Sequence, residues 1–251
     1  MKKIIAVLNF KGGVGKTTTA LSLGAALHEM GHHVLIIDLD GQCNTSQVLG
    51  YSAGDGDTLY EAMTDRRLSL PLPVYEYADG LDFVPASPRF ETIERDLGDR
   101  YHKEDLVRTL LAPFLGEYDY ILLDCPPNKG VLSTNALCAA TDLLVPMGGE
   151  PMSLQGVGAI MERYEDIRSQ ANPNLQLAGF LLTMYNARTN LHKDVARLMD
   201  EQSGGKVFRT HIRRCIALSE APAAGKTIID YAPHSNGAED YRALAREVKS
   251  E

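Results

Sequence analysis

The chain has 251 residues, of which 44% are hydrophobic and 23% are charged, and its formal net charge is −8 at pH 7. These values are ordinary for a globular protein and fit one large α/β domain over residues 1–251. No stretch approaches the roughly 18 consecutive apolar residues of a membrane span, and the four cysteines lack the C-x-x-C spacing of a zinc or disulfide framework. We therefore expect a soluble cytoplasmic protein with reduced thiols.

The first predicted elements are a strand, a glycine-rich loop and a helix. An apolar run over residues 4–8 has the composition of a buried parallel strand, and a stretch with helical periodicity runs from about Thr17 to Met30. The loop between them has glycines at positions 12, 13 and 15, which let the backbone turn tightly and point its N–H groups at an anion. The helix N-terminus adds its positive dipole end at the same place. This arrangement predicts a phosphate-binding loop.

Two side chains of this loop have the chemistry that a nucleoside triphosphate and magnesium require. Lys16 supplies a positive charge for the β and γ phosphates, and the Thr17 hydroxyl is a ligand for the Mg²⁺ that bridges them. The general pattern of such loops begins with a glycine where this chain has Phe10, and a second lysine, Lys11, follows it. A solvated lysine beside a glycine turn is the simpler interpretation of Lys11.

The loop resembles the deviant Walker A sequence KGGVGKT of the ParA/MinD class of P-loop ATPases. In that class the first lysine reaches across a dimer interface to the partner's nucleotide, so the resemblance implies that Lys11 acts in trans and that Lys11 and Lys16 both serve catalysis. It also implies ATP and Mg²⁺ as cofactors, and a single doubly wound, mostly parallel sheet flanked by helices. The predicted nucleotide-binding residues of the loop are Lys11, Gly12, Gly13, Val14, Gly15, Lys16, Thr17 and Thr18.

A second buried strand is predicted over His33–Asp38, and an acidic segment ends it. Because the ligand crevice of an α/β sheet opens at the carboxyl ends of its strands, Asp38 and Asp40 are expected beside the glycine loop. The segment resembles the family's D-x-D-P-Q-G-N switch sequence, although glycine at 41 and cysteine at 43 replace its proline and glycine. The resemblance implies that Asp40 orients or activates the attacking water and that Asp38 supports the Mg²⁺ shell and Lys16. The alternative is an Asx-turn that closes the strand.

The middle of the chain carries weaker patterns. A short helix is predicted over Thr58–Arg67 and a strand over Leu81–Pro85, whereas the rest of residues 51–80 gives little signal. Apolar residues at helical spacing then predict helices over residues 89–98 and 103–115 that dock on the sheet.

An apolar strand that ends at Asp124 gives the second strong signal. A carboxylate in this position is the Walker B arrangement, which holds Mg²⁺ directly or through water, and the run Y-D-Y-I-L-L-D-C-P-P closely resembles the family's version. The predicted metal residues are therefore Asp124, Thr17 and Asp40. Cys125 is expected to be a small buried residue and not a nucleophile, because no neighbouring histidine motif supports its activation.

The second half of the chain continues the alternation of helix and strand. Helices are predicted over residues 132–140 and 153–170, the latter with Ser153 as its N-cap, and strands over 142–146 and 176–184. By resemblance, Glu150 lies in a segment that lines the dimer face, and Asn186 and the segment 211–214 surround the adenine. A narrow apolar stripe over Glu239–Glu251 predicts a helix that docks on its own domain.

The C-terminal part resembles the chromosomal ParA proteins in particular, which bind DNA non-specifically as ATP-bound dimers. From residue 187 to 226 there are eight Lys/Arg against four acidic residues, a balance of +4 that leaves −12 for the rest of the chain. Such a local cationic patch suits salt-sensitive phosphate contacts. Ala217, His234 and Asn236 stand where relatives commonly carry arginine. The predicted DNA-binding residues are Arg188, Arg213, Arg214 and Lys226.

These features lead to one expected function and two alternatives. The resemblance implies an ATP-dependent dimerising switch with weak ATPase activity that binds DNA as the ATP dimer, associates with the nucleoid, and positions a plasmid, chromosome or protein assembly. A ParB-like or cargo-adaptor protein would stimulate hydrolysis. One alternative is a membrane-surface switch like MinD, which needs a basic amphipathic C-terminal helix; no stable membrane association is expected. The other is a metabolic P-loop enzyme with a small-molecule substrate.

Overall fold

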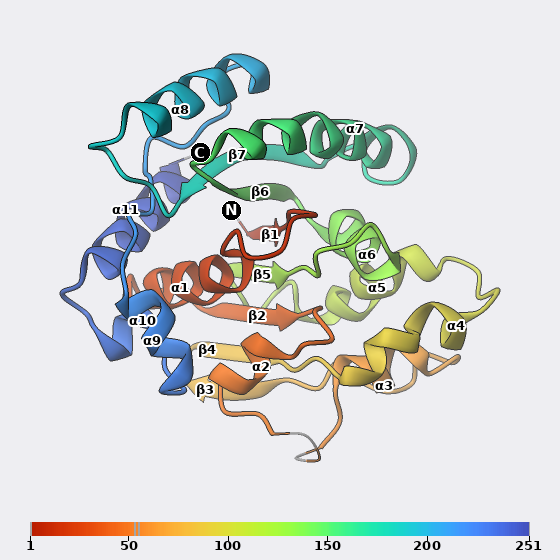
Figure 1. The fold of residues 1–251 in the computed structure, drawn as a ribbon. Coiled ribbons are helices and arrows are strands. Elements are labelled where there is room, and N and C mark those ends of the chain that lie inside the picture. Colours follow the sequence, from red (N-terminus) through yellow and green to blue (C-terminus); the bar gives the residue numbers. More distant parts are fainter. Residues whose placement is uncertain (1, 53, 55, 251) are drawn as a thin grey trace.

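The structure, a computed structural model, describes residues 2–52, 54 and 56–250, so Glu251 of the predicted last helix lies outside the described residues. Within this part of the chain, seven strands form one sheet in the order β3-β4-β2-β5-β1-β6-β7 (Figure 1). Its pairs are parallel except for the antiparallel pair of β3 and β4 at one edge. The strands are β1 (Lys3–Val7), β2 (Val34–Asp38), β3 (Tyr75–Ala78), β4 (Leu81–Val84), β5 (Tyr120–Asp124), β6 (Asp142–Gly148) and β7 (Gln176–Thr183).

Helices cover both faces of the sheet, as expected for a doubly wound fold. Successive strand residues alternate between two hydrophobic clusters: Ile36 joins the cluster beneath α1 and α11, whereas Leu35 and Ile37 join the cluster beneath α6 and α7. The first face carries α1 (Lys16–Glu29), α2 (Asn44–Val48), α9 (Ala217–Ala223), α10 (Ile228–Tyr231) and α11 (Asn236–Ser250). The second carries α3 (Leu59–Thr64), α4 (Ile93–Leu97), α5 (Leu106–Leu111), α6 (Val131–Ala139), α7 (Leu154–Gln170) and α8 (Asn190–Ser203).

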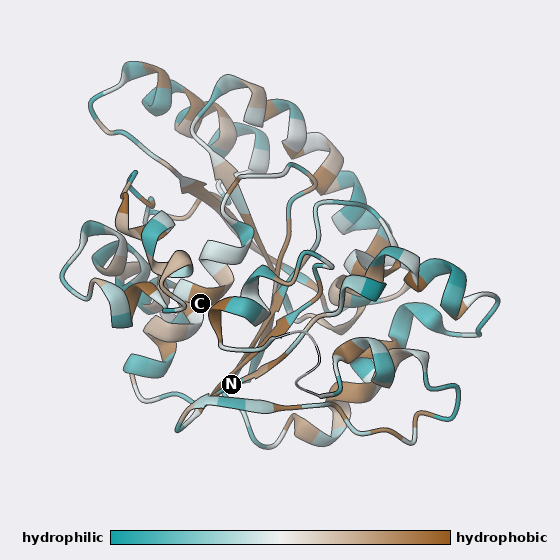
Figure 2. Ribbon diagram, turned by 60° about the horizontal axis from the view of Figure 1, so that its bottom comes forward, coloured by the Kyte–Doolittle hydropathy of each residue, from teal (hydrophilic) through white to brown (hydrophobic). Residues whose placement is uncertain are grey.

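The strands read as near-continuous hydrophobic runs because helices bury them on both sides. All five residues of β2 are buried, and so are all five of β5. Figure 2 shows the same pattern, with apolar strands through the middle and polar positions on the outer helices. No helix in the described part of the chain combines the length and apolar character that crossing a bilayer requires.

The last helix confirms the prediction that its apolar stripe docks on its own domain. Tyr241, Leu244, Ala245 and Val248 are each at most 2% exposed. They join the cluster beneath α1, and Arg242 extends this contact by an ion pair with Glu29. The stripe therefore packs α11 against the helix that follows the glycine loop.

Several parts of the sequence-based description need correction. The helix predicted over 89–98 is a 3₁₀ turn, Pro88–Thr92, followed by α4, which ends at Gly98 with φ +52°. The helix predicted over 103–115 is α5 between the 3₁₀ turns Lys103–Asp105 and Ala112–Phe114, because Pro113 lacks the N–H that would continue α5. The edge strand β3 and the short helix α2 were not predicted. Ser153 makes no side-chain cap: it already has helical dihedrals, because the 3₁₀ turn Pro151–Ser153 leads directly into α7.

The register of the central strands sets where the functional residues lie. Val7, the last residue of β1, is level with Asp124 of β5, and Asp124 is level with Asp38 of β2. The loops that follow these three strands therefore leave the sheet at the same edge. This brings the glycine loop and both acidic segments together, as the sequence predicts.

Candidate functional site

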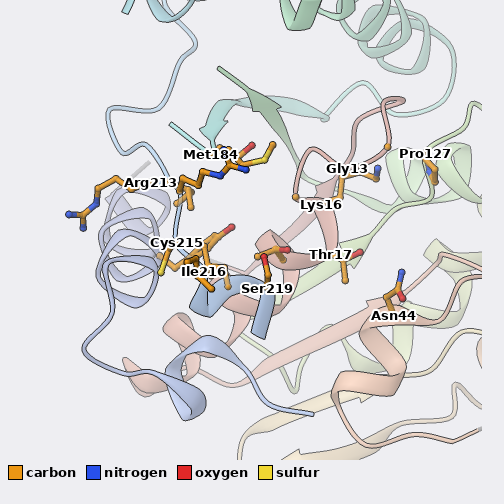
Figure 3. Close-up of a pocket in the computed structure, with 18 of the residues that line it drawn as sticks. Gly13, Lys16, Thr17, Asn44, Pro127, Met184, Arg213, Cys215, Ile216 and Ser219 are labelled. Carbon is orange, nitrogen blue, oxygen red and sulfur yellow. The ribbon is translucent and has the colours of Figure 1, made fainter. Parts of the chain in front are cut away.

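A cavity of about 560 Å³ opens at this edge of the sheet (Figure 3). At one end it is lined by the glycine loop, and at the other by the end of β7, the segment that leads into α9, the start of α9 and Tyr241 of α11. We call these the phosphate end and the base end. The phosphate end consists of Gly12, Gly13, Gly15, Lys16, Thr17, Thr18, Asp40, Asn44 and Pro127. The base end consists of Thr183, Met184, Ile212, Arg213, Arg214, Cys215, Ile216, Leu218, Ser219 and Tyr241.

The glycine loop has the conformation that an anion cradle requires. Gly13 and Gly15 have φ of +72° and +87°, values that residues with a Cβ rarely adopt. Asn9 holds the start of the loop by accepting a hydrogen bond from the Lys11 N–H at 2.9 Å. From the opposite side, the Thr183 hydroxyl donates to the Val14 carbonyl at 2.9 Å. The loop is thus fixed at both ends before any ligand binds, which lowers the entropy cost of binding.

Lys16 points into the interior of this loop. The residue is 7% exposed, and its ammonium donates to the Lys11 carbonyl oxygen at 3.2 Å. Burial lowers the pKa of Lys16, while the nearby carboxylates of Asp124 and Asp40 act to raise it. A buried ammonium in this position gains stabilisation from a polyphosphate, because the anion supplies the counter-charge that burial removes.

Asp124 has an oxygen atom that is ready for a metal ion. Its side chain is fully buried; Oδ2 accepts a hydrogen bond from the Thr45 hydroxyl at 2.8 Å, and Oδ1 has no hydrogen-bond partner among the described residues. Burial and the neighbouring Asp38 raise the pKa of Asp124 to about 7. An unpartnered buried carboxylate oxygen beside the Thr17 hydroxyl fits Mg²⁺, which prefers hard oxygen ligands. Asp124 and Thr17 are the residues that would hold it.

Asp38 is fully buried at the end of β2, beside Asp124. Its Oδ2 accepts hydrogen bonds from the hydroxyl and the N–H of Ser46, at 2.6 and 2.9 Å, and its Oδ1 accepts from the Asp40 N–H at 3.0 Å. Burial raises the pKa of Asp38 to about 6. These bonds fasten α2 to the end of β2, so Asp38 supports the acidic segment; its support of the Mg²⁺ shell and Lys16 stays a prediction.

Asp40 lines the cavity at its phosphate end. Its Oδ1 accepts a hydrogen bond from the Gln42 N–H at 3.0 Å, which is the Asx-turn that the sequence offered as an alternative. The turn and a functional role are compatible, because a carboxylate accepts several hydrogen bonds and this turn uses one oxygen. Asp40 therefore lies at the phosphate end, near enough to Lys16 to oppose the lowering of the Lys16 pKa by burial, with one carboxylate oxygen that the turn does not use.

The base end is mostly apolar and open. Ile216 is 76% exposed and Met184 is 43% exposed, although both line the cavity. Large apolar side chains left uncovered in a cavity suit the flat faces of a nucleobase. The predicted segment 211–214 does reach this wall, through Ile212, Arg213 and Arg214.

Asn186 does not reach the cavity. It is exposed, and its side chain accepts a hydrogen bond from the Arg188 N–H at 3.0 Å, so it closes a local turn after β7. Met184, two residues earlier, lines the cavity instead. The contact of Asn186 with adenine stays a prediction.

The Lys11 side chain lies outside the cavity. It is 49% exposed, and its Nζ lies 3.9 Å from Oε2 of Glu150. Two exposed charges at this distance attract each other weakly in water. Lys11 is therefore free to exchange its partner.

The four residues predicted to bind DNA divide into two groups. Arg188, Arg214 and Lys226 are exposed. Arg213 is not part of an open cationic surface: its guanidinium donates to both oxygens of Asp240, at 2.7 to 3.0 Å, and to Glu239 at 3.1 Å. These hydrogen bonds raise the pKa of Arg213 above its ordinary value.

Sequence patterns did not identify several cavity residues. Asn44, Pro127, Ser219 and Tyr241 line the cavity but were not predicted as site residues, although Asn44 ends the switch sequence and Pro127 ends the Walker B run. In the sequence, Tyr241 is explained by the apolar stripe of a docked helix, which does not indicate a place in the cavity. Its hydroxyl shares a hydrogen bond of 3.1 Å with the Thr19 hydroxyl. Only the packing of α11 on α1 brings it here. Cys125 is fully buried, as predicted, and burial raises its pKa.

Comparison with known proteins agrees with this geometry. A family model described as an AAA domain matches residues 2–177. The sporulation initiation inhibitor protein Soj of Bacillus subtilis is 38% identical over 249 residues, which cover 99% of this chain and 98% of the relative. The chain belongs to the ParA/Soj-type partition ATPases. The chromosome-partitioning ATPase Soj of Thermus thermophilus is 41% identical, over 97% of this ParA-family chain and 94% of its own length.

A solved structure supports the assignment of the cofactors. The Mycobacterium smegmatis protein named cobyrinic acid a,c-diamide synthase, with bound ADP and magnesium, superposes with a TM-score of 0.83 at 32% identity, and the match covers 98% of this chain and 93% of that one. ATP and Mg²⁺ are thus the cofactors of this ParA-family chain. The phosphate end described above is where they fit.

Proposed function

We propose that the chain is an ATP-dependent dimerising switch whose slow hydrolysis acts as a timer. The observation that carries the proposal is the contrast between its two loop lysines. Lys16 is buried in the phosphate end, whereas Lys11 is exposed outside the cavity, 3.9 Å from Glu150. One lysine already serves the nucleotide of its own subunit. The second would reach the nucleotide of a second copy, exchanging a weak surface contact for a charge-assisted bond to phosphate.

The residues at the phosphate end divide the work of hydrolysis. Lys16 and the loop N–H groups hold the triphosphate, Thr17 and Asp124 hold the metal, and Asp40 orients the attacking water. When bound, Mg²⁺ neutralises charge on the β and γ phosphates. Lys11 from the partner adds a further positive charge at the interface. Because two copies close only around intact ATP, loss of the terminal phosphate favours separation.

The experiment is a measurement of mass in solution. Wild-type protein with a non-hydrolysable ATP analogue and Mg²⁺ should sediment as a dimer, and with ADP as a monomer. Lys11→Ala should stay monomeric in both but still bind nucleotide. Lys249→Ala, which removes an exposed lysine that does not line the cavity, should dimerise as the wild type does. A wild-type mass that does not change with the analogue would refute the switch.

We also propose that the ATP-bound dimer binds DNA without sequence preference. Arg188, Arg214 and Lys226 are exposed in the segment that carries the local excess of positive charge. Each subunit offers few cations, so the dimer doubles the number of phosphate contacts and the affinity becomes steeply salt-dependent. The T. thermophilus relative is named a chromosome-partitioning ATPase, which supports this role. Association with the nucleoid in the cytoplasm follows, with a ParB-like or cargo-adaptor protein as the stimulating partner.

Retention of a DNA duplex at two salt concentrations tests the DNA proposal. With ATP, retention should be strong at low salt and weaker at moderate salt, and Arg214→Ala should reduce it. Arg66→Ala is the matched control, because it removes one exposed arginine from outside the segment 187–226. Equal losses in both variants would show that net charge, not this surface, determines binding.

A metabolic ATP-dependent enzyme is the second candidate. It is favoured by the name of the M. smegmatis structure, a synthase that acts on cobyrinic acid. ATP turnover in the presence of cobyrinic acid, compared with turnover in the presence of duplex DNA, separates the two. A MinD-like membrane role is disfavoured by the last helix, whose apolar stripe is buried against α1.

A further inference from the structure

The base end of the cavity depends on a segment that has little regular structure. We call residues 212–216 the base wall. One side of this segment is held by the end of β7: the Tyr185 N–H donates to the Ile212 carbonyl at 2.9 Å, and the Arg214 N–H donates to the Tyr185 carbonyl at 3.3 Å. A loop held along one side by main-chain bonds can still tilt about that side. Its position relative to the phosphates therefore needs a second support.

Asp240 on α11 provides that support through Arg213. It accepts the Arg213 backbone N–H at 2.8 Å and the guanidinium Nε and Nη2 at 2.7 to 3.0 Å. The Asp240 side chain is 11% exposed and that of Arg213 is 43% exposed, so the pair is partly shielded from water. In Figure 3 the Arg213 side chain points away from Lys16 and Thr17. Arg213 thus anchors the wall rather than contacting a ligand through its charge.

The same helix is also fastened to the phosphate end. Tyr241, next to Asp240, shares a hydrogen bond with Thr19, two residues after Thr17 on α1. Arg242 pairs with Glu29 at the far end of α1. Helix α11 therefore connects the base wall with the helix that begins at Lys16. This connection fixes the distance between the two ends of the cavity.

We propose that Asp240 is a positioning residue for nucleotide-base recognition: through Arg213 it holds the base wall at the distance from the phosphate loop that an adenosine requires. The inference rests on the nucleotide-binding role proposed above. It predicts a split between ligands. A ligand with a base loses affinity when the pair is broken, whereas a ligand made of phosphate alone does not, because the glycine loop, Lys16 and Thr17 are unchanged.

Calorimetric titration of the full chain with Mg²⁺ and three probes tests the proposal: ATP, ADP and inorganic tripolyphosphate. Asp240→Asn should lower the affinity for ATP and for ADP by about tenfold, because the charge-assisted hydrogen bonds that hold Arg213 are weakened. The affinity for tripolyphosphate should stay within about twofold of the wild-type value. Asp240→Glu keeps the charge and should recover part of the loss. In turnover, KM for ATP should rise by more than kcat falls. Thermal melting monitors folding, and Asp240→Glu keeps the comparison possible if the asparagine variant unfolds.

Glu247→Gln is the matched control. Glu247 lies on the same helix and accepts the Arg209 and Thr210 N–H groups at 2.7 and 2.9 Å, outside the cavity. It should destabilise the chain without separating ATP from tripolyphosphate. Equal losses for all three probes in Asp240→Asn, or unchanged ATP affinity, would overturn the inference. If wild-type protein bound tripolyphosphate but not ATP, the proposed function itself would fail.

Discussion

The phosphate end and the base end of the cavity are built in opposite ways. The phosphate end comes mainly from one continuous stretch, residues 12–18, together with Asp40, Asn44 and Pro127, which follow the neighbouring strands β2 and β5. The base end is assembled from three segments distant in sequence: the end of β7, the base wall with α9, and α11. The first end recognises charge by groups fixed on a tight turn, and the second recognises shape by apolar surface. Substitutions should therefore have larger effects at the phosphate end than at the base end.

The largest expected effect is that of Lys16→Ala. This variant removes the buried counter-charge of the β and γ phosphates, which corresponds to about 3 kcal/mol, or roughly a hundredfold in the affinity for Mg-ATP. Titration with a fluorescent ATP analogue measures it. Lys11→Ala is the control within the same loop, because Lys11 does not line the cavity. Similar losses for the two lysines would contradict their separate roles.

Asp40→Ala should separate binding from hydrolysis. The carboxylate orients the attacking water, and such a group contributes roughly a hundredfold to the rate, whereas ATP affinity should change little because Lys16 and the glycine loop are intact. Single-turnover hydrolysis and equilibrium binding of ATP give the two quantities. The variant should also stay dimeric longer after ATP is added. A normal rate of hydrolysis would show that Asp40 serves only the turn with Gln42.

Asp124→Asn should remove the benefit of magnesium. The amide is a weak ligand for Mg²⁺, and the Thr45 hydroxyl can still donate to its carbonyl oxygen, so folding should be preserved. We expect that Mg²⁺ improves the ATP affinity of the wild type by about tenfold (roughly 1.4 kcal/mol) and that of the variant hardly at all. Titrations with Mg²⁺ and with EDTA measure the difference. An undiminished response to Mg²⁺ in the variant would place the metal elsewhere.

The smallest expected effect is that of Ile216→Ala at the base end. Ile216 is 76% exposed, so truncation should not destabilise the fold. Covering its side chain with a base is worth about 1 kcal/mol, which is roughly fivefold in affinity for ATP and ADP alike. Leu191→Ala is the control, since Leu191 is 50% exposed but does not line the cavity. A loss as large as that of Lys16→Ala would erase the distinction between the two ends.

Most of the fold and the phosphate end could be predicted from the sequence, because their signals are local. The strands that become β1, β2 and β5 are uninterrupted apolar runs, and the motif residues follow them within a few positions. The edge strand β3 was missed since it has four residues with a weak alternation, and its one strand neighbour in the described sheet is β4. The base end was predicted in part. The predicted segment 211–214 lines the cavity, whereas Asn186 does not line it and accepts a hydrogen bond from the Arg188 N–H. The pairing of Arg213 with Asp240 was not predicted.

The sequence by itself determined a glycine loop between a strand and a helix, two acidic strand ends beside it, and membership of one ATPase family. These follow from residues within a few positions of each other, where backbone geometry leaves few alternatives. The tertiary structure decided which side chains line the base end of the cavity and which arginine pairs with Asp240. It also decided how α11 connects the base wall with α1. Those outcomes depend on contacts such as Arg213–Asp240 and Thr19–Tyr241, whose members lie 27 and 222 residues apart. Side-chain periodicity shows that such residues are buried or paired, but only packing selects the partner.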